Sequence, residues 1–221
     1  MNNNNLPFLF LLVPFAVGIP VVLWSIRYRR KRTQEFEQIA QQLGFSFLGE
    51  PWRGPVLSPV DKTCILQRTR GGFRNVMIGA VGGLDVAVFD YTYQMGKSTV
   101  TLTLAAFAHD RKIPPFELRS ENLADKIGEA FVHNDIDFDS NPEFSKRYFL
   151  RSPDEEGSRS FFTPGLLAYF EQIQPDKQWH IESSGNTLIL YRYRQFMKAA
   201  EIPSFLDESS TIARTILGAA H

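Results

Sequence analysis

Residues 75–93, NVMIGAVGGLDVAVFDYTY, carry the clearest secondary-structure signal of this 221-residue chain. Two runs rich in β-branched and aromatic residues flank Gly82-Gly83, and both glycines accept the positive φ angles of a two-residue hairpin turn. In the second run, aliphatic and aromatic side chains alternate as they do in a strand whose two faces differ. The pattern predicts antiparallel strands at Asn75–Val81 and Leu84–Tyr93.

A third strand is expected directly after this hairpin. Met95–Ser98 is turn-like, and TVTLTLAAFA at 99–108 alternates apolar residues with threonines. Gly96-Lys97-Ser98 has the final letters of a phosphate-binding loop, but the glycine that this motif needs five residues earlier is Tyr91 here. The segment is therefore predicted to be a turn within an antiparallel meander.

The rest of the chain mixes helix and strand signals, which predicts an α+β fold. After Pro114-Pro115 the predicted elements are a strand, a helix capped by Ser120, two helix starts with proline at the first position, a second hairpin and an amphipathic helix. They fall at Phe116–Arg119, after Ser120, at Asn141-Pro142, at Thr163-Pro164, at 178–194 and from about Pro203. We expect a helix-plus-meander subdomain at 34–113 and a helix-rich α+β subdomain at 114–221. Whether their hairpins share one sheet or form two stays open.

The first 26 residues contain no charged side chain, and Leu6–Trp24 is almost wholly apolar. As a helix these 19 residues extend for about 28 Å, close to the roughly 30 Å hydrocarbon core of a bilayer. Trp24 stands where an interfacial aromatic residue is common. Residues 1–26 are therefore predicted to be a transmembrane anchor.

The segment 27–33 forms a basic juxtamembrane collar, whose charged residues are Arg27, Arg29, Arg30, Lys31 and Arg32. Juxtamembrane Lys and Arg stay on the cytoplasmic side, so we expect an external N-terminus and a cytoplasmic C-terminal domain at the cell (inner or plasma) membrane. The alternative is a cleaved signal peptide. That alternative is disfavoured because the basic residues follow the apolar run and do not precede it.

A helix is expected directly after the collar. In TQEFEQIAQQLG, the apolar residues Phe36, Ile39, Ala40 and Leu43 recur at the spacing of one helical face, and Gly44 is a typical stop residue. Since no helix breaker separates Trp24 from this segment, the anchor and the helix are predicted to be nearly continuous.

Charge is distributed unevenly along the chain. Five of the 24 basic residues lie in the collar, so after residue 32 the 24 acidic residues outnumber the remaining 19 basic ones and leave a net charge of −5. This balance argues against nucleic-acid binding, also by the arginines of RTRGGFR at 68–74. That segment is predicted to be a solvated hairpin end, with contact to lipid headgroups as the alternative.

The densest polar segment is HNDIDFDSNPE, with Asp135, Asp137 and Asp139 at alternate positions. Hard cations favour such carboxylates, but the segment departs from an EF-hand loop at Ser140 and Lys146, where glycine and glutamate are needed. The favoured interpretation is a solvated capping loop. A weak metal site at the three aspartates is the alternative.

Asp90 is the most informative single residue within the meander. It shares a face with Val86 and Val88, so it is expected to be partly buried and to need a partner. Arg74 on the preceding strand is the predicted partner, in a structural ion pair. A ligand-binding acid on a concave sheet is the functional alternative.

No catalytic, nucleotide or cofactor motif is recognisable. Cys64 resembles a small buried hydrophobic residue, and His109, His133 and His180 occur outside any metal or triad motif. The sequence therefore predicts no cofactor, leaves enzymatic activity undecided and favours a non-enzymatic role.

Several motifs together resemble a widespread, uncharacterised bacterial family of N-terminally membrane-anchored proteins. They are a basic juxtamembrane helix, an Arg-Asn pair, an FDY-x-Y strand, a DIDFD…PEFS stretch and a terminal LYR strand, here at Arg74-Asn75, Phe89–Tyr93, Asp135–Ser145 and Leu190–Arg192. The resemblance extends over nearly the whole chain. It implies fold and anchoring but no activity.

Two functional hypotheses follow. The first is a membrane-tethered cytoplasmic module that binds a protein partner as an adaptor or scaffold. The second is a cation- or ligand-dependent enzyme or sensor, tethered in the same way, that uses Asp135–Asp139.

Overall fold

The structure is a computed structural model that describes residues 6–49, 65–69, 71–120, 135–173, 178–193 and 195–219. Within these ranges the side chains of residues 6–18, 67 and 68 are not described. The helix predicted after Ser120, the residues Cys64 and His133, and the side chains of Arg68 and Arg70 lie outside the described part.

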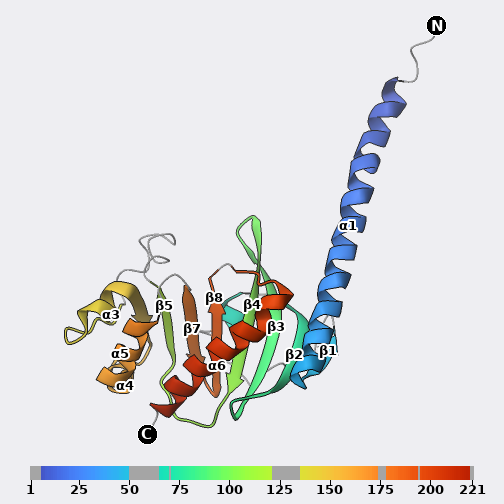
Figure 1. Ribbon diagram of the computed structural model, residues 1–221. Helices are drawn as coiled ribbons and strands as arrows, with labels where there is room; N and C mark the ends of the chain where they lie inside the picture. The colour runs from blue at the N-terminus through green and yellow to red at the C-terminus, as the bar shows by residue number, and fades with distance from the viewer. Residues whose placement is uncertain are drawn as a thin grey trace.

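The described residues form a mixed α+β fold around one antiparallel sheet, which confirms the predicted fold class (Figure 1). The strand order is β1-β2-β3-β4-β8-β7-β5-β6. The strands are β1 (Ser46–Gly49), β2 (Gly72–Val81), β3 (Leu84–Met95), β4 (Ser98–Ala108), β5 (Phe116–Ser120), β6 (Tyr148–Arg151), β7 (Trp179–Ser184) and β8 (Thr187–Arg192). The helices are α1 (Leu6–Leu43), α2 (Ile65–Arg68), α3 (Pro142–Arg147), α4 (Glu155–Phe161), α5 (Pro164–Gln172) and α6 (Ile202–Gly218), with a 3₁₀ turn η4 (Ala199–Glu201) before α6.

The pairing of β4 with β8 joins the strands into one sheet. Leu104 lies opposite Tyr191 and Ala108 lies opposite Thr187, so the predicted 34–113 and 114–221 segments contribute to a single sheet. Both predicted hairpins are present, with turns at Gly82-Gly83 and Gly185-Asn186. The turn at Gly96-Lys97 joins β3 to β4, as predicted.

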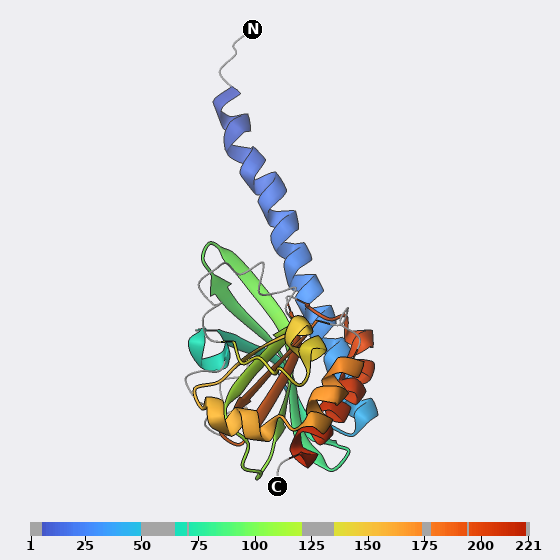
Figure 2. The same ribbon diagram turned by 90° about the vertical axis from the view of Figure 1, so that its left-hand side faces the viewer.

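The two faces of the sheet have different covers. On one face, α1, α5 and α6 pack over a large core that includes Phe36, Val88, Phe107, Leu190 and Phe205. The other face carries a smaller cluster around Phe89, Tyr91 and Leu104, against which Ile65 of α2 packs. Figure 2 shows the sheet nearly edge-on, with α2 on one side and α1, α5 and α6 on the other.

Helix α1 is continuous from Leu6 to Leu43, as predicted, and Gly44 ends it with a φ of +71°. Its C-terminal turns pack on β1 and β2, whereas its N-terminal half extends away from the sheet (Figure 1). Among the described residues, no helix is both long and apolar enough to cross a membrane. The side chains of residues 6–18, most of the predicted span, are outside that part.

Four short elements were not predicted from the sequence, namely α2, β6, α4 and η4. Asp154 caps the first turn of α4 by accepting a bond from the Gly157 N–H. β6 became a strand because it pairs with β5, a partner about 30 residues away in the chain. Such a four-residue strand has too few residues to show a period-2 pattern by itself.

Candidate functional site

The first candidate site is the junction where α1 meets the sheet. Arg32 points inward from α1 and binds Asp90 of β3 through two bonds, Nε to Oδ2 at 2.7 Å and Nη2 to Oδ1 at 2.8 Å. Its remaining nitrogen Nη1 donates to the Met197 carbonyl at 2.7 Å, in the segment between β8 and η4. Arg32 thereby connects α1 with β3 and with the segment between β8 and η4.

The junction is almost closed to solvent and its polar groups are paired. Arg32 is 6% exposed and Asp90 2% exposed. Asp90 also accepts from Asn75 Nδ2 at 2.8 Å and from Thr103 Oγ1 at 3.0 Å. The guanidinium lies 3.7 Å from the ring centroid of Phe196 and 4.9 Å from that of Phe36, so apolar walls strengthen the pair by excluding water.

Asp90 is buried in an ion pair, and Arg32 is a partner that the sequence did not indicate. Arg74, the predicted partner, lies opposite Asp90 in the register of β2 and β3. A register shift follows Arg74, where Asn75 adopts a φ of +51° and brings its own amide to Asp90. Nothing in the sequence of the basic collar indicates that Arg32, unlike its neighbours, reaches Asp90.

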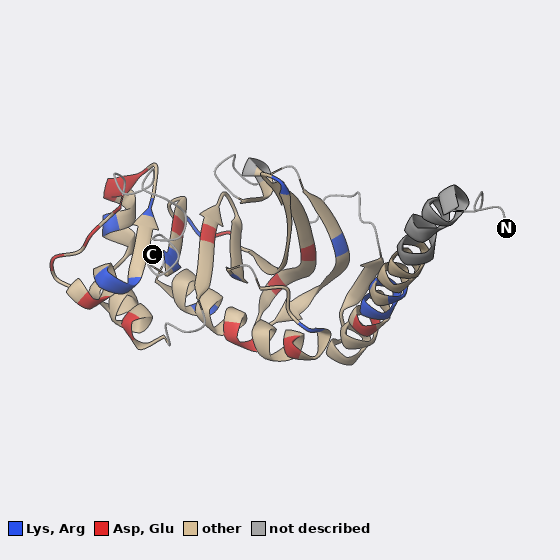
Figure 3. Ribbon diagram, turned by 90° about the horizontal axis from the view of Figure 1, so that it is seen from above, with Lys and Arg blue, Asp and Glu red and all other residues tan. Residues whose placement is uncertain are grey.

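The other collar residues remain on the surface. Arg27, Arg29, Arg30 and Lys31 are all exposed, and they cluster on α1 between its N-terminal half and the sheet (Figure 3). The preceding turns expose large apolar side chains to solvent, with Trp24 68% exposed. Ile19, Val21, Val22, Leu23 and Ile26 are exposed as well. The described part of α1 thus changes along its axis from exposed apolar residues to exposed basic residues and then to turns that pack on the sheet.

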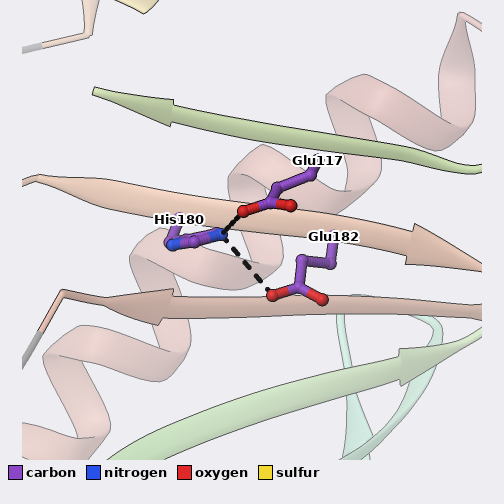
Figure 4. A group of neighbouring side chains, drawn as sticks. All are labelled: Glu117, His180 and Glu182. Carbon is purple, nitrogen blue, oxygen red and sulfur yellow. Dashed lines mark hydrogen bonds and ion pairs between the residues drawn. The ribbon is translucent and has the colours of Figure 1, made fainter. Parts of the chain in front are cut away.

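A second candidate site lies on the opposite face of the sheet, where β5 and β7 bring Glu117, His180 and Glu182 together (Figure 4). His180 Nε2 is 3.0 Å from Glu117 Oε1 and 3.5 Å from Glu182 Oε1. All three residues are buried, and their potential ligand atoms lie within 4.8 Å of one another. Two carboxylates and an imidazole are a donor set that Zn²⁺ accepts, so the arrangement must be tested as a metal site.

The donors already present around this group argue against a metal. Glu117 Oε2 accepts from Arg151 at 2.6 Å, and Glu182 accepts from the Tyr191 hydroxyl at 2.8 Å and from the Ile65 N–H at 2.7 Å. Metal-bound histidines normally donate their second ring nitrogen to a partner, but Nδ1 of His180 is buried without one. The group fits a hydrogen-bonded polar network that joins β5, β6, β7 and β8.

The aspartates of the predicted loop serve mainly local structure. Asp135 accepts from the Leu150 N–H at 2.9 Å, which attaches the loop to β6, whereas the side chains of Asp137 and Asp139 are exposed. Burial raises the pKa of Asp135, and the bond from Leu150 opposes this in part. Within the described residues, the grouping with metal-ligand spacing is Glu117, His180 and Glu182, and it does not include these aspartates.

A shallow groove of about 550 Å³ lies at the far end of the sheet, between the β2–β3 turn, the end of β4 and the end of α6. Its lining includes Asp85, Asp110, Arg111 and Arg214 beside His109. Burial lowers the pKa of His109, whose Nδ1 lies 3.2 Å from the Arg111 carbonyl oxygen. The mixed charges give the groove no preference for one sign of ligand.

Comparison with protein-family models and with curated proteins yields no match. Among solved structures, the chain is similar to the crystal structure of the mycobacterial trehalose monomycolate transport factor A, TtfA. The superposition has a TM-score of 0.54 with 14% sequence identity, and covers 87% of this chain and 98% of that one. At this identity the similarity establishes a shared fold.

Proposed function

We propose that this protein is a membrane-tethered adaptor or scaffold, whose α+β domain binds a protein partner at the cytoplasmic face of the cell membrane. Residues 1–26 are the anchor, with the N-terminus outside, and the collar at 27–33 lies at the cytoplasmic headgroups. The role is non-enzymatic.

The observation that carries this proposal is the surface of α1. A run of large apolar side chains from Ile19 to Ile26 is exposed, and exposed basic residues follow it directly. Exposing this much apolar surface to water is unfavourable, at roughly 25 cal/mol per Å². A bilayer that covers the apolar run, with Arg27–Lys31 among its headgroups, removes that cost.

The junction of Arg32 with Asp90 supports a scaffolding role. Because α1 continues without interruption from the apolar run into a buried ion pair at the sheet centre, the domain is held at a defined orientation to its anchor. Such a rigid connection suits a protein that presents one surface to a neighbour in the membrane. The fold is shared with a protein named as a transport factor, which makes components of a lipid-transport assembly the first partners to test.

Crosslinked co-purification of the full-length chain from its native membrane tests the partner directly. The matched control is the anchor alone, residues 1–33, with the same tag. A partner recovered with the full chain and absent from the control is the expected result. Recovery of the same proteins with both baits would contradict binding by the domain.

A topology reporter tests the anchoring separately. Fused after His221, a reporter active only in the cytoplasm should give a signal, and one active only outside should not. The opposite pattern would overturn the orientation.

The second candidate function is a cation-dependent enzyme or sensor at Asp135–Asp139. The exposure of Asp137 and Asp139, which leaves their carboxylates available to a cation, is the observation in its favour. It requires that Ca²⁺ or Mg²⁺ raise the Tm of the wild type and not that of the Asp137→Asn/Asp139→Asn variant. Equal Tm values with and without cation exclude it.

A further inference from the structure

The β3–β4 hairpin extends beyond the sheet as a two-stranded ribbon. Tyr93 lies opposite Val100 and Met95 opposite Ser98, and these pairs have no flanking strand within the described residues. β2 accompanies β3 only as far as Thr92, and β8 accompanies β4 only from Leu104. The tip therefore projects past the body of the sheet.

The projection points to the same side as the N-terminal half of α1. Arg32 binds Asp90, whereas the later turns of α1 pack in the core that contains Val86 and Val88. The two elements are therefore antiparallel, so the N-terminal half of α1 and the C-terminal end of β3 extend to the same side. Figures 1 and 2 show the hairpin and the helix rising from the sheet on this one side.

The rise per residue of strands and helices gives the position along α1 that lies level with the hairpin tip. From Asp90 to Met95 a strand advances by about 17 Å at about 3.4 Å per residue. The same rise takes about 11 residues of α-helix, which leads from Arg32 to the region of Val21. If the axes of β3 and α1 diverge, the tip reaches less far along α1. The tip therefore lies near the level of Trp24, where the apolar run meets the basic residues.

The chemistry of the tip matches a headgroup region. Met95 is 42% exposed and Lys97 is exposed, on either side of Gly96 with its φ of +61°. Residues 92–101, TYQMGKSTVT, contain one basic and no acidic residue. A flexible apolar side chain beside an ammonium group is suited to the boundary between acyl chains and anionic phosphates.

We propose that the hairpin tip, Met95–Gly96–Lys97, contacts the surface of an anionic phospholipid bilayer beside the α1 anchor. The inference rests on the proposed membrane anchoring and adds a second point of attachment. Two separated contacts prevent the domain from rotating about α1, and they set which edge of the sheet faces a membrane partner.

Site-specific fluorescence quenching in vesicles tests this proposal. The full-length chain, with Cys64→Ser and one cysteine at Met95, Leu23 or Lys112, is labelled with an environment-sensitive dye. It is reconstituted into phosphatidylserine/phosphatidylcholine vesicles that contain headgroup spin-labelled lipid. Lys112 is the matched control because it is exposed and follows β4 at the opposite end of the sheet.

The expected result is quenching at residues 23 and 95 and none at 112. Adding Lys97→Gln to the Met95→Cys chain should lower the ratio of membrane-bound to free hairpin tips about fivefold, because one basic residue near an anionic surface contributes that factor. Quenching at residue 23 should not change.

The outcomes separate the two proposals. Quenching at 23 with none at 95 would overturn the hairpin contact and leave the anchoring intact, whereas no quenching at either position would contradict the anchoring itself. Equal quenching at 95 in pure phosphatidylcholine would overturn the role of anionic lipid. Crosslinking of residue 95 to a protein in native membranes, without quenching in vesicles, would assign the tip to a protein instead.

Discussion

The guanidinium of Arg32 and the carboxylate of Asp90 meet through two parallel bonds at the centre of the sheet, 58 residues apart in the chain. Arg32 is the last of a run of basic residues, and its neighbours Arg30 and Lys31 are exposed. Its position on α1 turns it inward, so one residue of an otherwise exposed basic cluster fixes the helix to the domain. Substitutions of Arg32 and of the exposed arginines of the collar should therefore have different effects on stability.

Replacing Arg32 by alanine should destabilise the domain by about 3–5 kcal/mol, because the Asp90 carboxylate is left buried without its cation. Arg30→Ala, two positions away on the exposed surface, should change the free energy of unfolding by no more than about 0.5 kcal/mol. Urea denaturation of the chain from residue 27 onward measures both. Equal effects of the two substitutions would contradict the role of Arg32.

Arg32→Lys should retain only part of the stability. An ammonium group cannot make two parallel bonds to Asp90 and also reach the Met197 carbonyl with a planar fork. We expect the free energy of unfolding to lie between those of the wild type and Arg32→Ala. A fully stable lysine variant would show that charge alone is sufficient.

The network around His180 should stabilise the fold and should not bind a metal ion. Glu117→Gln should cost about 1.5–3 kcal/mol, since it weakens charge-assisted bonds to Arg151 and His180. The matched control is Glu143→Gln on the exposed surface of α3, which should leave the free energy of unfolding nearly unchanged because its pair with Lys146 is screened by solvent. Zn²⁺ and EDTA should leave the Tm of the wild type unchanged, and a rise in Tm with Zn²⁺ that Glu117→Gln abolishes would establish a metal site.

Asp135 should give the stability a pH dependence. Because burial raises its pKa in the folded state, protonation favours folding: this contribution is fully present below the unfolded value of 3.8 and is lost as pH rises through the raised folded pKa. The wild type should therefore gain stability relative to Asp135→Asn as pH falls from 7. Denaturant titrations of both chains across this range measure the difference, and a difference independent of pH would contradict the assigned cause.

Asp135→Ala separates charge from hydrogen bonding. Asparagine keeps an acceptor for the Leu150 N–H, whereas alanine leaves that buried donor unpaired at a cost of about 1–3 kcal/mol. At neutral pH the alanine variant should be clearly less stable than the asparagine variant. Equal stabilities would mean that the bond to Leu150 contributes little.

Local pattern was sufficient for most elements, but not for their assembly. The hairpin at Gly82-Gly83 and the helix start at Thr163-Pro164 follow from turn and capping preferences of a few adjacent residues. The pairing of β4 with β8 depends on residues about 80 positions apart, and no periodicity within either strand specifies it. The sequence accordingly predicted the pieces and left the number of sheets open.

In the candidate sites too, local sequence predicts the single residues, whereas their partners depend on how distant segments pack. Alternation along β3 predicted that Asp90 is buried and paired, whereas the identity of its partner depended on how α1 crosses the sheet. His180 and Glu182 are spaced by two on a predicted strand, so their shared face could have been recognised. Glu117 joins them only through the pairing of β5 with β7, which sequence alone does not reveal.

The single sheet makes a final prediction about fragments. In a chain cut at the predicted subdomain boundary, residues 34–113 lose β8, which pairs with β4, and α6, which packs over β4. Phe107 and Ala105, both fully buried in the intact domain, would then face water beside an open strand edge. Neither 34–113 nor 114–221 should therefore fold alone, and 27–221, which keeps Arg32, should unfold in one cooperative transition. Circular dichroism melts and amide NMR dispersion of the three chains measure this, and a folded 34–113 fragment would show that the meander is an independent domain despite the continuous sheet.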